Sequence, residues 1–508
     1  MIYEELATGE EKGLKNTFFP IPPNQNMTKT ILIALDGATW DVLDPLLQKG
    51  EMPVIQSLIA HGCRGSLGSL SGYKSPALWT SIATGKFPEE TGITYFSNLF
   101  LELPLVKKRI NISNNIFIKG PYMIGKLFSS NLKKPGKITT LTKQSHIYAQ
   151  EKLGNLLQKC KLGGNYLVTS TFRTQKAFWE IWNDAGKSCG IVGWLATWPT
   201  DKIKGFMISP KACPAFIRTL ASEKRKDSES ADPATYPDYL MEALQELNGF
   251  ELSSLEELKL IFDVKKLTEQ EQKELYGHDY NPANLLQFSR HLIHTDQFFL
   301  KAAEIARDKY KPDLLAVYLP GIDGFQHIFW RHHQPEQFPF APLTKNEQKY
   351  SSVIVNYYKF IDQKLGKLLK KEKDALIIIM SDHGIKAIPE KDYNPQSIRS
   401  GQHDQSPDGI IILNGPMIQK NKIISGAHLL DIMPTLLYLS GLPVDETMTG
   451  NVLNDAISDD FLAHTPLHKT TYQKRKVSRS FYSPQEEQNE KEVLKKLGYL
   501  KHEGKEKP

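Results

Sequence analysis

Four short apolar runs constrain the fold of this 508-residue chain more than any other feature. They are ILIAL (31–35), LLAVYL (314–319), ALIIIM (375–380) and GIIIL (409–413). Each is rich in aliphatic, mostly branched side chains and lacks polar alternation, which is typical of strands buried on both faces of a sheet. Helical patterns lie between them, so the sequence predicts an α/β fold with a largely parallel sheet.

Two further segments support this alternation. Apolar residues recur every three or four positions across residues 346–371, which predicts a helix. Residues 177–199 have the pattern of a helix, a turn and a strand, with Gly186 as a C-cap, and we expect them to belong to the core sheet.

The remaining segments set the predicted domain boundaries, because polar and basic loops or acidic helical stretches replace the α/β pattern there. We divide the chain into a flexible leader (1–26), a first core part (27–96), a cap insertion (97–165), a second core part (166–210), a second cap insertion (211–285), a third core part (286–453) and a basic tail with a short terminal helix (454–508).

The tail contains the basic run HKTTYQKRKVSR (468–479), which we expect to be solvated. Ser483 and Glu486 after it have the spacing of a capping box, with Pro484 at the first helical position, and predict the terminal helix.

The net charge of the chain indicates which kinds of ligand it suits. The chain has 63 basic and 57 acidic residues, a net charge of +6, which suits anionic small molecules without indicating nucleic acid. No run approaches the ~18 apolar residues of a membrane span, and the first 26 residues lack the apolar segment of a signal peptide. We therefore expect no membrane insertion, and a cytoplasmic location.

Metal-ligating residue types follow the predicted strands, at the sheet edge where α/β proteins bind ligands. These residues are Asp36 after the first run, Asp323 and His327 after the second, Asp382 and His383 after the third, and His403 shortly before the fourth. Singly, each has an ordinary explanation, such as an Asp that caps a turn. Jointly, three carboxylates and three imidazoles predict a site for two divalent ions, with zinc favoured over manganese or iron.

Ser75 has two readings. It starts a predicted helix and precedes Pro76, so it could simply be an N-cap. A hydroxyl at a helix N-terminus also lies where backbone N–H groups attract phosphate, so it could be a nucleophile.

The chain resembles the alkaline phosphatase superfamily, specifically its type I phosphodiesterase/nucleotide pyrophosphatase branch. The resemblance covers residues 28–453 and rests on the blocks ILIALDGATWDVL, SPALWTSIATGKFPEETGI, YLPGIDGFQHIFW, MSDHG and GQHDQSPDGIIILNGP. It implies an alkaline-phosphatase-like three-layer sandwich with an inserted cap, and Ser75, ten residues before Gly85, as the nucleophile. It further implies one metal held by Asp323, His327 and His403 and the other by Asp36, Asp382, His383 and the Ser75 oxygen.

Two positions depart from the family pattern. Phe96 stands where many members have an asparagine that holds a phosphate oxygen, and Asn98 follows two residues later. Thr91 replaces a common histidine. We expect Asn98, Lys74 and Trp79 to contact substrate, with Trp79 and residues 194–198 available to stack on a nucleobase.

The predicted activity is metal-dependent hydrolysis of phosphodiester or pyrophosphate bonds, including those of nucleotides, through a phosphoseryl intermediate. A monoester dianion needs a strong cationic clamp, and no arginine lies between Arg64 and Arg109, which favours diesters. The alternatives are a phosphomonoesterase or phosphomutase of the same superfamily, a sulfatase-like hydrolase, or a non-catalytic binding module. Sulfatases need an arginine where Trp79 stands.

Overall fold

The computed structural model describes residues 29–103, 108–111, 156, 157, 160, 163–216, 233–248 and 255–476. The predicted leader and the predicted terminal helix lie outside these residues.

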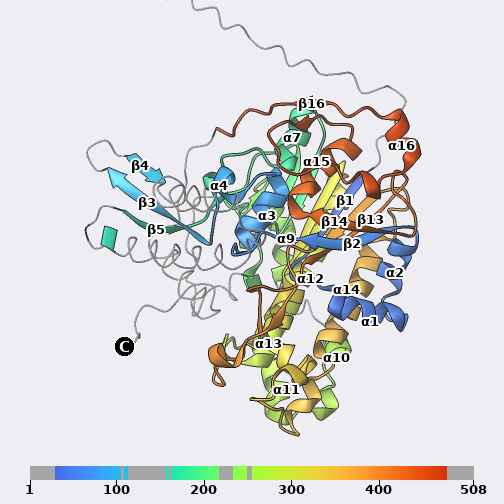
Figure 1. Ribbon diagram of the computed structural model, residues 1–508. Helices are drawn as coiled ribbons and strands as arrows, with labels where there is room; N and C mark the ends of the chain where they lie inside the picture. Colours follow the sequence, from blue (N-terminus) through green and yellow to red (C-terminus); the bar gives the residue numbers. More distant parts are fainter. Residues whose placement is uncertain are drawn as a thin grey trace, which may run out of the picture.

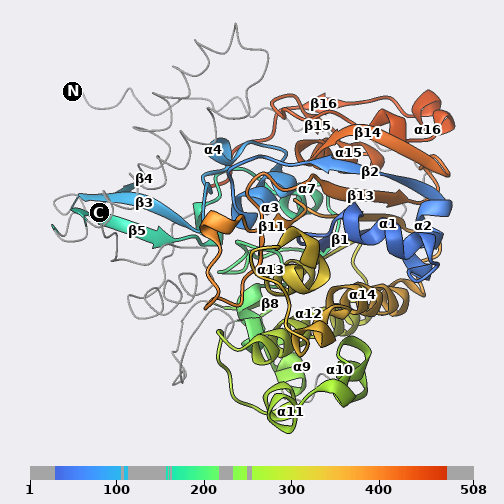
Figure 2. The same cartoon turned by 60° about the horizontal axis from the view of Figure 1, so that its bottom comes forward.

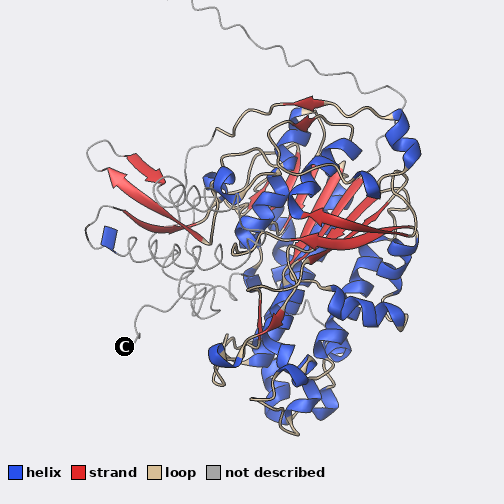
Figure 3. Cartoon of the chain, in the orientation of Figure 1, coloured by secondary structure: helices blue, strands red, loops and turns tan. Residues whose placement is uncertain are grey.

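A nine-stranded sheet forms the centre of the structure (Figures 1 and 3). In spatial order its strands are β14 (Lys422–His428), β2 (Gly62–Gly68), β13 (Gly409–Asn414), β10 (Leu376–Met380), β1 (Thr30–Leu35), β9 (Leu314–Leu319), β6 (Cys189–Val192), β7 (Gly205–Ile208) and β8 (Thr235–Tyr236). The four apolar runs are β1, β9, β10 and β13, as predicted. All residues of β1, β9 and β10 are buried.

Strand direction places several chain segments at one edge of this sheet. β1 pairs in parallel with both β9 and β10, whereas β13 runs antiparallel to β10 and to β2. β13 is therefore an antiparallel member of a mostly parallel sheet. As a result, the start of β13 and the carboxyl end of β2 lie at the same edge as the carboxyl ends of β1, β9 and β10.

Helices cover both faces of the sheet, which gives three layers (Figure 2). Successive side chains of β1 enter different clusters, with Ile31 and Ile33 in one and Leu32 and Ala34 in the other. The first cluster includes α1 (Trp40–Gln48), α2 (Pro53–Ala60), α12 (Leu285–Tyr310), α13 (Gly321–His333) and α14 (Val353–Leu369); the second includes α3 (Ser75–Thr84), α7 (Phe178–Asp184) and α15 (Ile432–Leu439). The predicted three-layer α/β architecture is confirmed.

Both predicted helices are present, but their boundaries differ from the predicted ones. α14 begins at Val353, after a 3-10 turn at Glu347–Tyr350, rather than at residue 346. α7 ends with Ala185 as its C-cap, one residue before the predicted Gly186, which follows in the left-handed region (φ 76°) and leads to β6.

The two segments that the sequence predicts as caps have different structures. In the first, β3 (Ser97–Leu103), β4 (Lys108–Asn111) and β5 (Gly163–Leu167) form a separate sheet beside the main body (Figure 1). In the second, α9 (Leu240–Leu244), α10 (Leu255–Ile261) and α11 (Glu269–Tyr276) contribute to the first core cluster, and β8 pairs with β7. The described part of the second segment is thus continuous with the core.

Small elements complete the described structure: α4 (Pro88–Thr91), α16 (Asp459–His464), β11 (Lys386–Ala387), β12 (Gly401–Gln402), β15 (Val444–Asp445) and β16 (Lys469–Thr470). Among the described helices, none combines the length and the apolar character that crossing a membrane requires.

Most residues in the described part of the basic run (468–476) are exposed, as the sequence predicts, but two contacts fix this segment to the core. β16 pairs with β15, and Arg475 reaches a buried site between α7 and β7. Its Nε lies 3.0 Å from Glu180 Oε1, and its guanidinium also pairs with Asp201. Arg173 binds the same two carboxylates, so two arginines and two acids form one network.

Candidate active site

Six of the predicted site residues meet at the sheet edge described above, and they come from the ends of four strands or from the helix that follows one of them. Asp36 follows β1, Asp323 and His327 lie on α13 after β9, Asp382 and His383 follow β10, and His403 precedes β13. His403 can come before its strand because β13 is antiparallel to β10.

Asp36, Asp382 and His383 form a first group. His383 Nε2 lies 3.4 Å from Asp36 Oδ1 and 3.5 Å from Asp382 Oδ2. All three residues are buried, and within the described residues these three atoms and Asp382 Oδ1 lack any hydrogen-bond partner. Buried polar atoms are rarely left in this way, so a cluster of four identifies a place where a ligand is expected.

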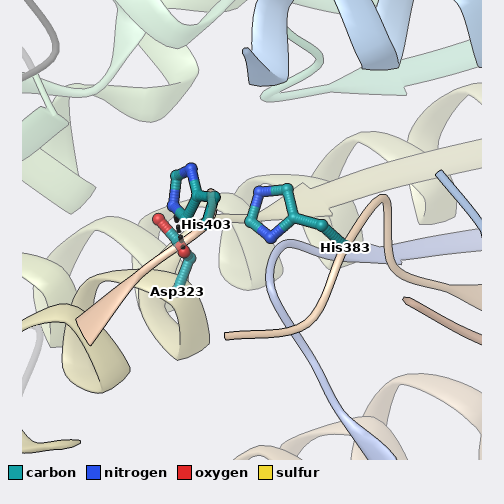
Figure 4. A group of neighbouring side chains, drawn as sticks. All are labelled: Asp323, His383 and His403. Carbon is teal, nitrogen blue, oxygen red and sulfur yellow. Dashed lines mark hydrogen bonds and ion pairs between the residues drawn. The ribbon is translucent and has the colours of Figure 1, made fainter. Parts of the chain in front are cut away.

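Asp323, His327 and His403 form a second group. His403 Nε2 lies 3.0 Å from Asp323 Oδ1 and 2.5 Å from His327 Nε2, and His327 Nε2 lies 3.4 Å from Asp323 Oδ2. The ring of His403 also lies next to that of His383, with centroids 4.1 Å apart (Figure 4). The two groups therefore adjoin.

The charges of these side chains fit divalent cations. Burial, reinforced by the charge of Asp323, raises the pKa of Asp36, and burial with the charge of Asp36 raises the pKa of Asp382 well above its usual range. Burial lowers the pKa of His327 and of His403, which favours the neutral imidazole that binds metal. A cation between the groups would offset the repulsion between the carboxylates that helps to raise their pKa values. It would also bind to the neutral imidazoles.

Two sets of ligand atoms are close enough to hold a metal. One atom each from Asp36, Asp382 and His383 lie within 4.8 Å of one another, and so do atoms from Asp323, His383 and His403. His383 belongs to both sets. The mixture of carboxylate and imidazole suits zinc, manganese or iron better than the oxygen-preferring magnesium and calcium.

Backbone carbonyls orient two of the imidazoles. Nδ1 of His327 lies 2.7 Å from Gly401 O, and Nδ1 of His383 lies 2.9 Å from Gly384 O. A ring that donates from Nδ1 carries its lone pair on Nε2, so both rings present Nε2 to the centre.

Trp79, predicted to stack on a nucleobase, supports Asp36 instead. Its side chain is fully buried, its Nε1 lies 3.3 Å from Asp36 Oδ2, and it packs edge-on against Trp194 and Tyr318. The hydroxyl of Tyr318 also donates to Asp36 Oδ2. A buried ring offers no face to a base, so the structure corrects this expectation.

Gly37 allows α13 to approach β1. It has a φ of 71°, and a Cβ there would lie 2.9 Å from Asp323 Oδ1. Gln326 Nε2 donates to Gly37 O at 2.7 Å, which fixes the turn against the same helix. Only glycine combines this backbone conformation with such close contact.

Ser75 is the first residue of α3, with Lys74 rather than Ser75 as the N-cap. Trp79, four residues on and so on the same helix face, contacts Asp36. Lys74 Nζ lies 3.6 Å from Asp404 Oδ1, beside His403. α3 thus contacts the first group through Trp79, and Lys74 at its start lies beside the loop that carries His403. The role of Ser75 stays a prediction.

Asn98 and Thr91 have local partners. Asn98 is buried on β3, and its Nδ2 donates to Gly92 O at 2.5 Å. Thr91 Oγ1 donates to Pro88 O at 2.9 Å. Substrate contact by Asn98 and by Lys74 stays a prediction.

Arg399 is a site residue that the sequence did not single out. Its Nη2 lies 3.0 Å from His327 Nδ1 and 3.3 Å from His327 Nε2. Arg399 is more than 300 residues from Ser75 in the sequence, so proximity along the chain gives no sign of it. The one feature of the sequence that points to Arg399 is its position four residues before His403, in the same loop.

The nine-stranded α/β sheet has an Asp/His cluster at one edge with α3 beside it, an arrangement that suits a metal-dependent hydrolase of phosphoric esters. The family model for "Type I phosphodiesterase / nucleotide pyrophosphatase" matches residues 30–400, which include every candidate site residue except His403. The chain belongs to this family and is an enzyme of the phosphoric ester hydrolase class.

Solved structures similar to the chain include murine ectonucleotide pyrophosphatase/phosphodiesterase 5, both alone and as an inactive variant in complex with AMP. Each is 13% identical with a TM-score of 0.40, and the alignment covers 85% of this chain and 100% of that one. The human protein aligns with the same coverage and identity and a TM-score of 0.39. No curated protein matches the sequence.

Proposed function

We propose that the protein hydrolyses phosphodiester or pyrophosphate bonds of small molecules, including nucleotides, with Ser75 as the nucleophile. The observation that carries this proposal is the set of unpartnered ligand atoms on Asp36, Asp382 and His383 next to the helix that begins at Ser75. Divalent ions, when bound by the six Asp and His residues, would supply the positive charge that makes a hydroxyl acidic and a phosphorus atom electrophilic.

The chain itself supplies position and orientation. Ser75 Oγ gives its proton to solvent water and forms a bond to phosphorus, while the bond to the leaving oxygen breaks. The leaving oxygen keeps the electron pair of that bond and takes up a proton from solvent. Water then attacks the phosphoseryl group and releases Ser75. Backbone N–H groups in the first turn of α3 face the non-bridging oxygens of the phosphate. Tyr318 and Trp79 hold Asp36 throughout.

The test is Ser75→Ala, with bis-p-nitrophenyl phosphate and a nucleotide pyrophosphate as substrates. We expect a loss of several orders of magnitude in kcat, because the residue that forms the intermediate is absent. Metal content, measured by elemental analysis, should stay close to that of the wild type, because six other ligands remain.

Ser81→Ala on the same helix is the matched control. Ser81 is buried and lies one and a half turns further along α3, so its loss removes a hydroxyl without touching the site. Turnover by Ser75→Ala at the wild-type rate would exclude Ser75 as the nucleophile.

A further inference from the structure

A buried hydrogen bond joins the two ligand groups through the chain neighbours of two of their members. Gln326 Nε2 on α13 donates to Gly37 O at 2.7 Å, and the Gln326 side chain is completely buried. Gly37 directly follows Asp36 of the first group, and Gln326 directly precedes His327 of the second. Because both bonded residues adjoin a predicted ligand, a change in this bond would move one group relative to the other.

Tyr358 on α14 makes a second connection between the same two segments. Its hydroxyl donates to Gln326 Oε1 at 3.0 Å and accepts from Thr39 N at 3.1 Å. Thr39 lies two residues after Gly37, in the turn that follows β1. A hydroxyl has one hydrogen to donate and lone pairs to accept, so both bonds can exist together. The bonds thus run from Gly37 through Gln326 and Tyr358 back to Thr39.

The directions of these bonds fix the orientation of the Gln326 amide. A carbonyl oxygen can only accept, so the amide nitrogen must face Gly37, and the amide oxygen accepts from Tyr358. An amide that is bonded through both its nitrogen and its oxygen cannot turn without losing both bonds. Gln326 is therefore a rigid spacer between α13 and the turn after β1.

The first group has a connection of its own, which does not involve Gln326. Ser381 Oγ donates to Ala38 O at 2.6 Å, and it accepts from Ile410 N at 2.9 Å. Ser381 directly precedes Asp382, so this bond holds the end of β10 against the turn after β1. Loss of Gln326 would therefore leave the first group intact and change only its position relative to the second.

Like charges give the spacer a physical role. Asp36 and Asp323 belong to different groups, and both are buried. Besides burial, the charge of Asp323 raises the pKa of Asp36, so the two carboxylates interact. Their repulsion favours a wider separation of the groups, and it is strong where water is excluded. The bond from Gln326 to Gly37 opposes that separation.

We propose that Gln326 and Tyr358 are positioning residues that set the separation of two bound metal ions, one in each ligand group. This inference rests on the proposed function, because it takes both groups to bind cations. It goes further in assigning the spacing to two residues that are not ligands. Residues that orient ligands in this way typically change metal affinity 10- to 100-fold.

The test compares Gln326→Met with the wild type after each protein has received two equivalents of Mn²⁺. Methionine has a similar length, but it has no hydrogen to donate to Gly37. We expect the magnetic coupling between the two ions, measured by electron paramagnetic resonance, to be weaker in the variant. Calorimetric titration should show the second binding step weakened about 10- to 100-fold and the first little changed, because only the second step needs both groups in register.

Tyr358→Phe is the milder variant, because it keeps the bond from Gln326 to Gly37. It should weaken the coupling less than Gln326→Met does. The effects of the two substitutions should be less than additive, since both remove the bond between Gln326 and Tyr358. Tyr358→Phe also answers the question where Gln326→Met does not fold.

Asn356→Ala is the matched control. Asn356 lies on α14, two residues before Tyr358, and its Nδ2 donates to Ile261 O on α10 at 3.1 Å. The variant should lower the midpoint of urea denaturation, because it removes a hydrogen bond between helices. It should leave the manganese coupling and both binding steps unchanged.

The outcomes separate this inference from the proposed function. Unchanged coupling and affinities in Gln326→Met and Tyr358→Phe would overturn the inference alone, since the two residues would then only stabilise the fold. An equal loss of coupling in Asn356→Ala would overturn it as well. Fewer than two manganese ions bound by the wild type would instead overturn the metal centre of the proposed function.

Discussion

Asp382 shows how strongly a single side chain in the centre depends on a bound cation. It is fully buried, and neither of its oxygens has a hydrogen-bond partner among the described residues. In the absence of metal such a carboxylate is costly, whereas under the proposed function it would be a metal ligand. Its contribution to stability should therefore change sign with metal content.

We predict that Asp382→Asn stabilises the metal-free protein by about 1 to 3 kcal/mol, because it removes one of several neighbouring buried carboxylates. With zinc present the order should reverse, since the variant loses a ligand and with it the stabilisation by binding. Chemical denaturation with and without a chelator checks both signs. Asp362→Asn, also buried but bonded to the backbone N–H groups of Val54 and Ile55, should destabilise in both conditions.

A variant of Tyr318 removes a hydrogen bond that holds Asp36 and leaves the Asp36 carboxylate in place. The Tyr318 hydroxyl donates to Asp36 Oδ2, and burial raises its pKa well above the usual value, so it remains a donor. Tyr318→Phe should reduce metal affinity or turnover about 10- to 100-fold, as is typical of residues that orient ligands. Competition with a chelator measures the affinity. An unchanged affinity and rate would show that Trp79 alone holds Asp36.

Helix α13 carries Asp323 and His327, and its start is held by a buried acid on another helix. Asp296 on α12 accepts from Gly321 N at 3.1 Å and from the hydroxyl of Tyr357 at 2.7 Å. A Cβ on Gly321 would lie 2.3 Å from Asp296 Oδ2, so the packing requires glycine. The position of two predicted ligands thus depends on a contact between α12, α13 and α14.

Burial raises the pKa of Asp296 to about 7 from the ordinary 3.8. The folded protein then binds more protons than the unfolded chain between these values. The stability contributed by this group is fully present below pH 3.8 and is lost as the pH rises to about 7, on the order of 4 kcal/mol in all. Asp296→Asn keeps an acceptor for Gly321 N, and its amide N–H can donate to the hydroxyl oxygen of Tyr357 in place of the oxygen that accepts from Tyr357 in the wild type.

The prediction is that unfolding free energy falls less steeply in Asp296→Asn than in the wild type between pH 4 and 7. Urea denaturation at several pH values, in the presence of a chelator for both proteins, measures the difference in slope. Parallel curves for the two proteins would show that Asp296 does not titrate in this range.

The strands and most ligand positions could be predicted because the signals are local. Each buried run is a continuous apolar stretch, and Asp36, Asp382 and His383 come within three residues of a strand end. The direction of β13 could not be predicted, because it depends on partners far away in the chain. For the same reason the sequence did not reveal that Arg399 contacts His327 or that Trp79 turns toward Asp36.

Arg475 links the described end of the chain to the body of the molecule. It shares Glu180 and Asp201 with Arg173, and the side chains of both arginines are almost completely buried. The neighbouring lysines of the basic run are exposed, so the composition of the run is that of a solvated tail. One buried residue within a basic run leaves no periodic signal in the sequence.

Arg475→Ala should destabilise the protein by about 2 to 3 kcal/mol, because two buried carboxylates lose a charged hydrogen-bond donor although Arg173 remains. Lys474→Ala is the matched control, since Lys474 is exposed, and should change stability by less than about 0.5 kcal/mol. The midpoint of urea denaturation measures both. Equal stability of the two variants would show that the Arg475 contacts are not maintained in solution.

The order of strands in the main sheet also has a consequence for synthesis of the chain. β1 is made first, yet its neighbours on both sides are β9 and β10, which begin at Leu314 and Leu376. At roughly 5 to 20 residues per second, the ribosome needs on the order of 15 to 60 seconds to reach them. During that interval an apolar segment that will become the middle of the enzyme has no partner, so nascent chains should need a chaperone to avoid aggregation.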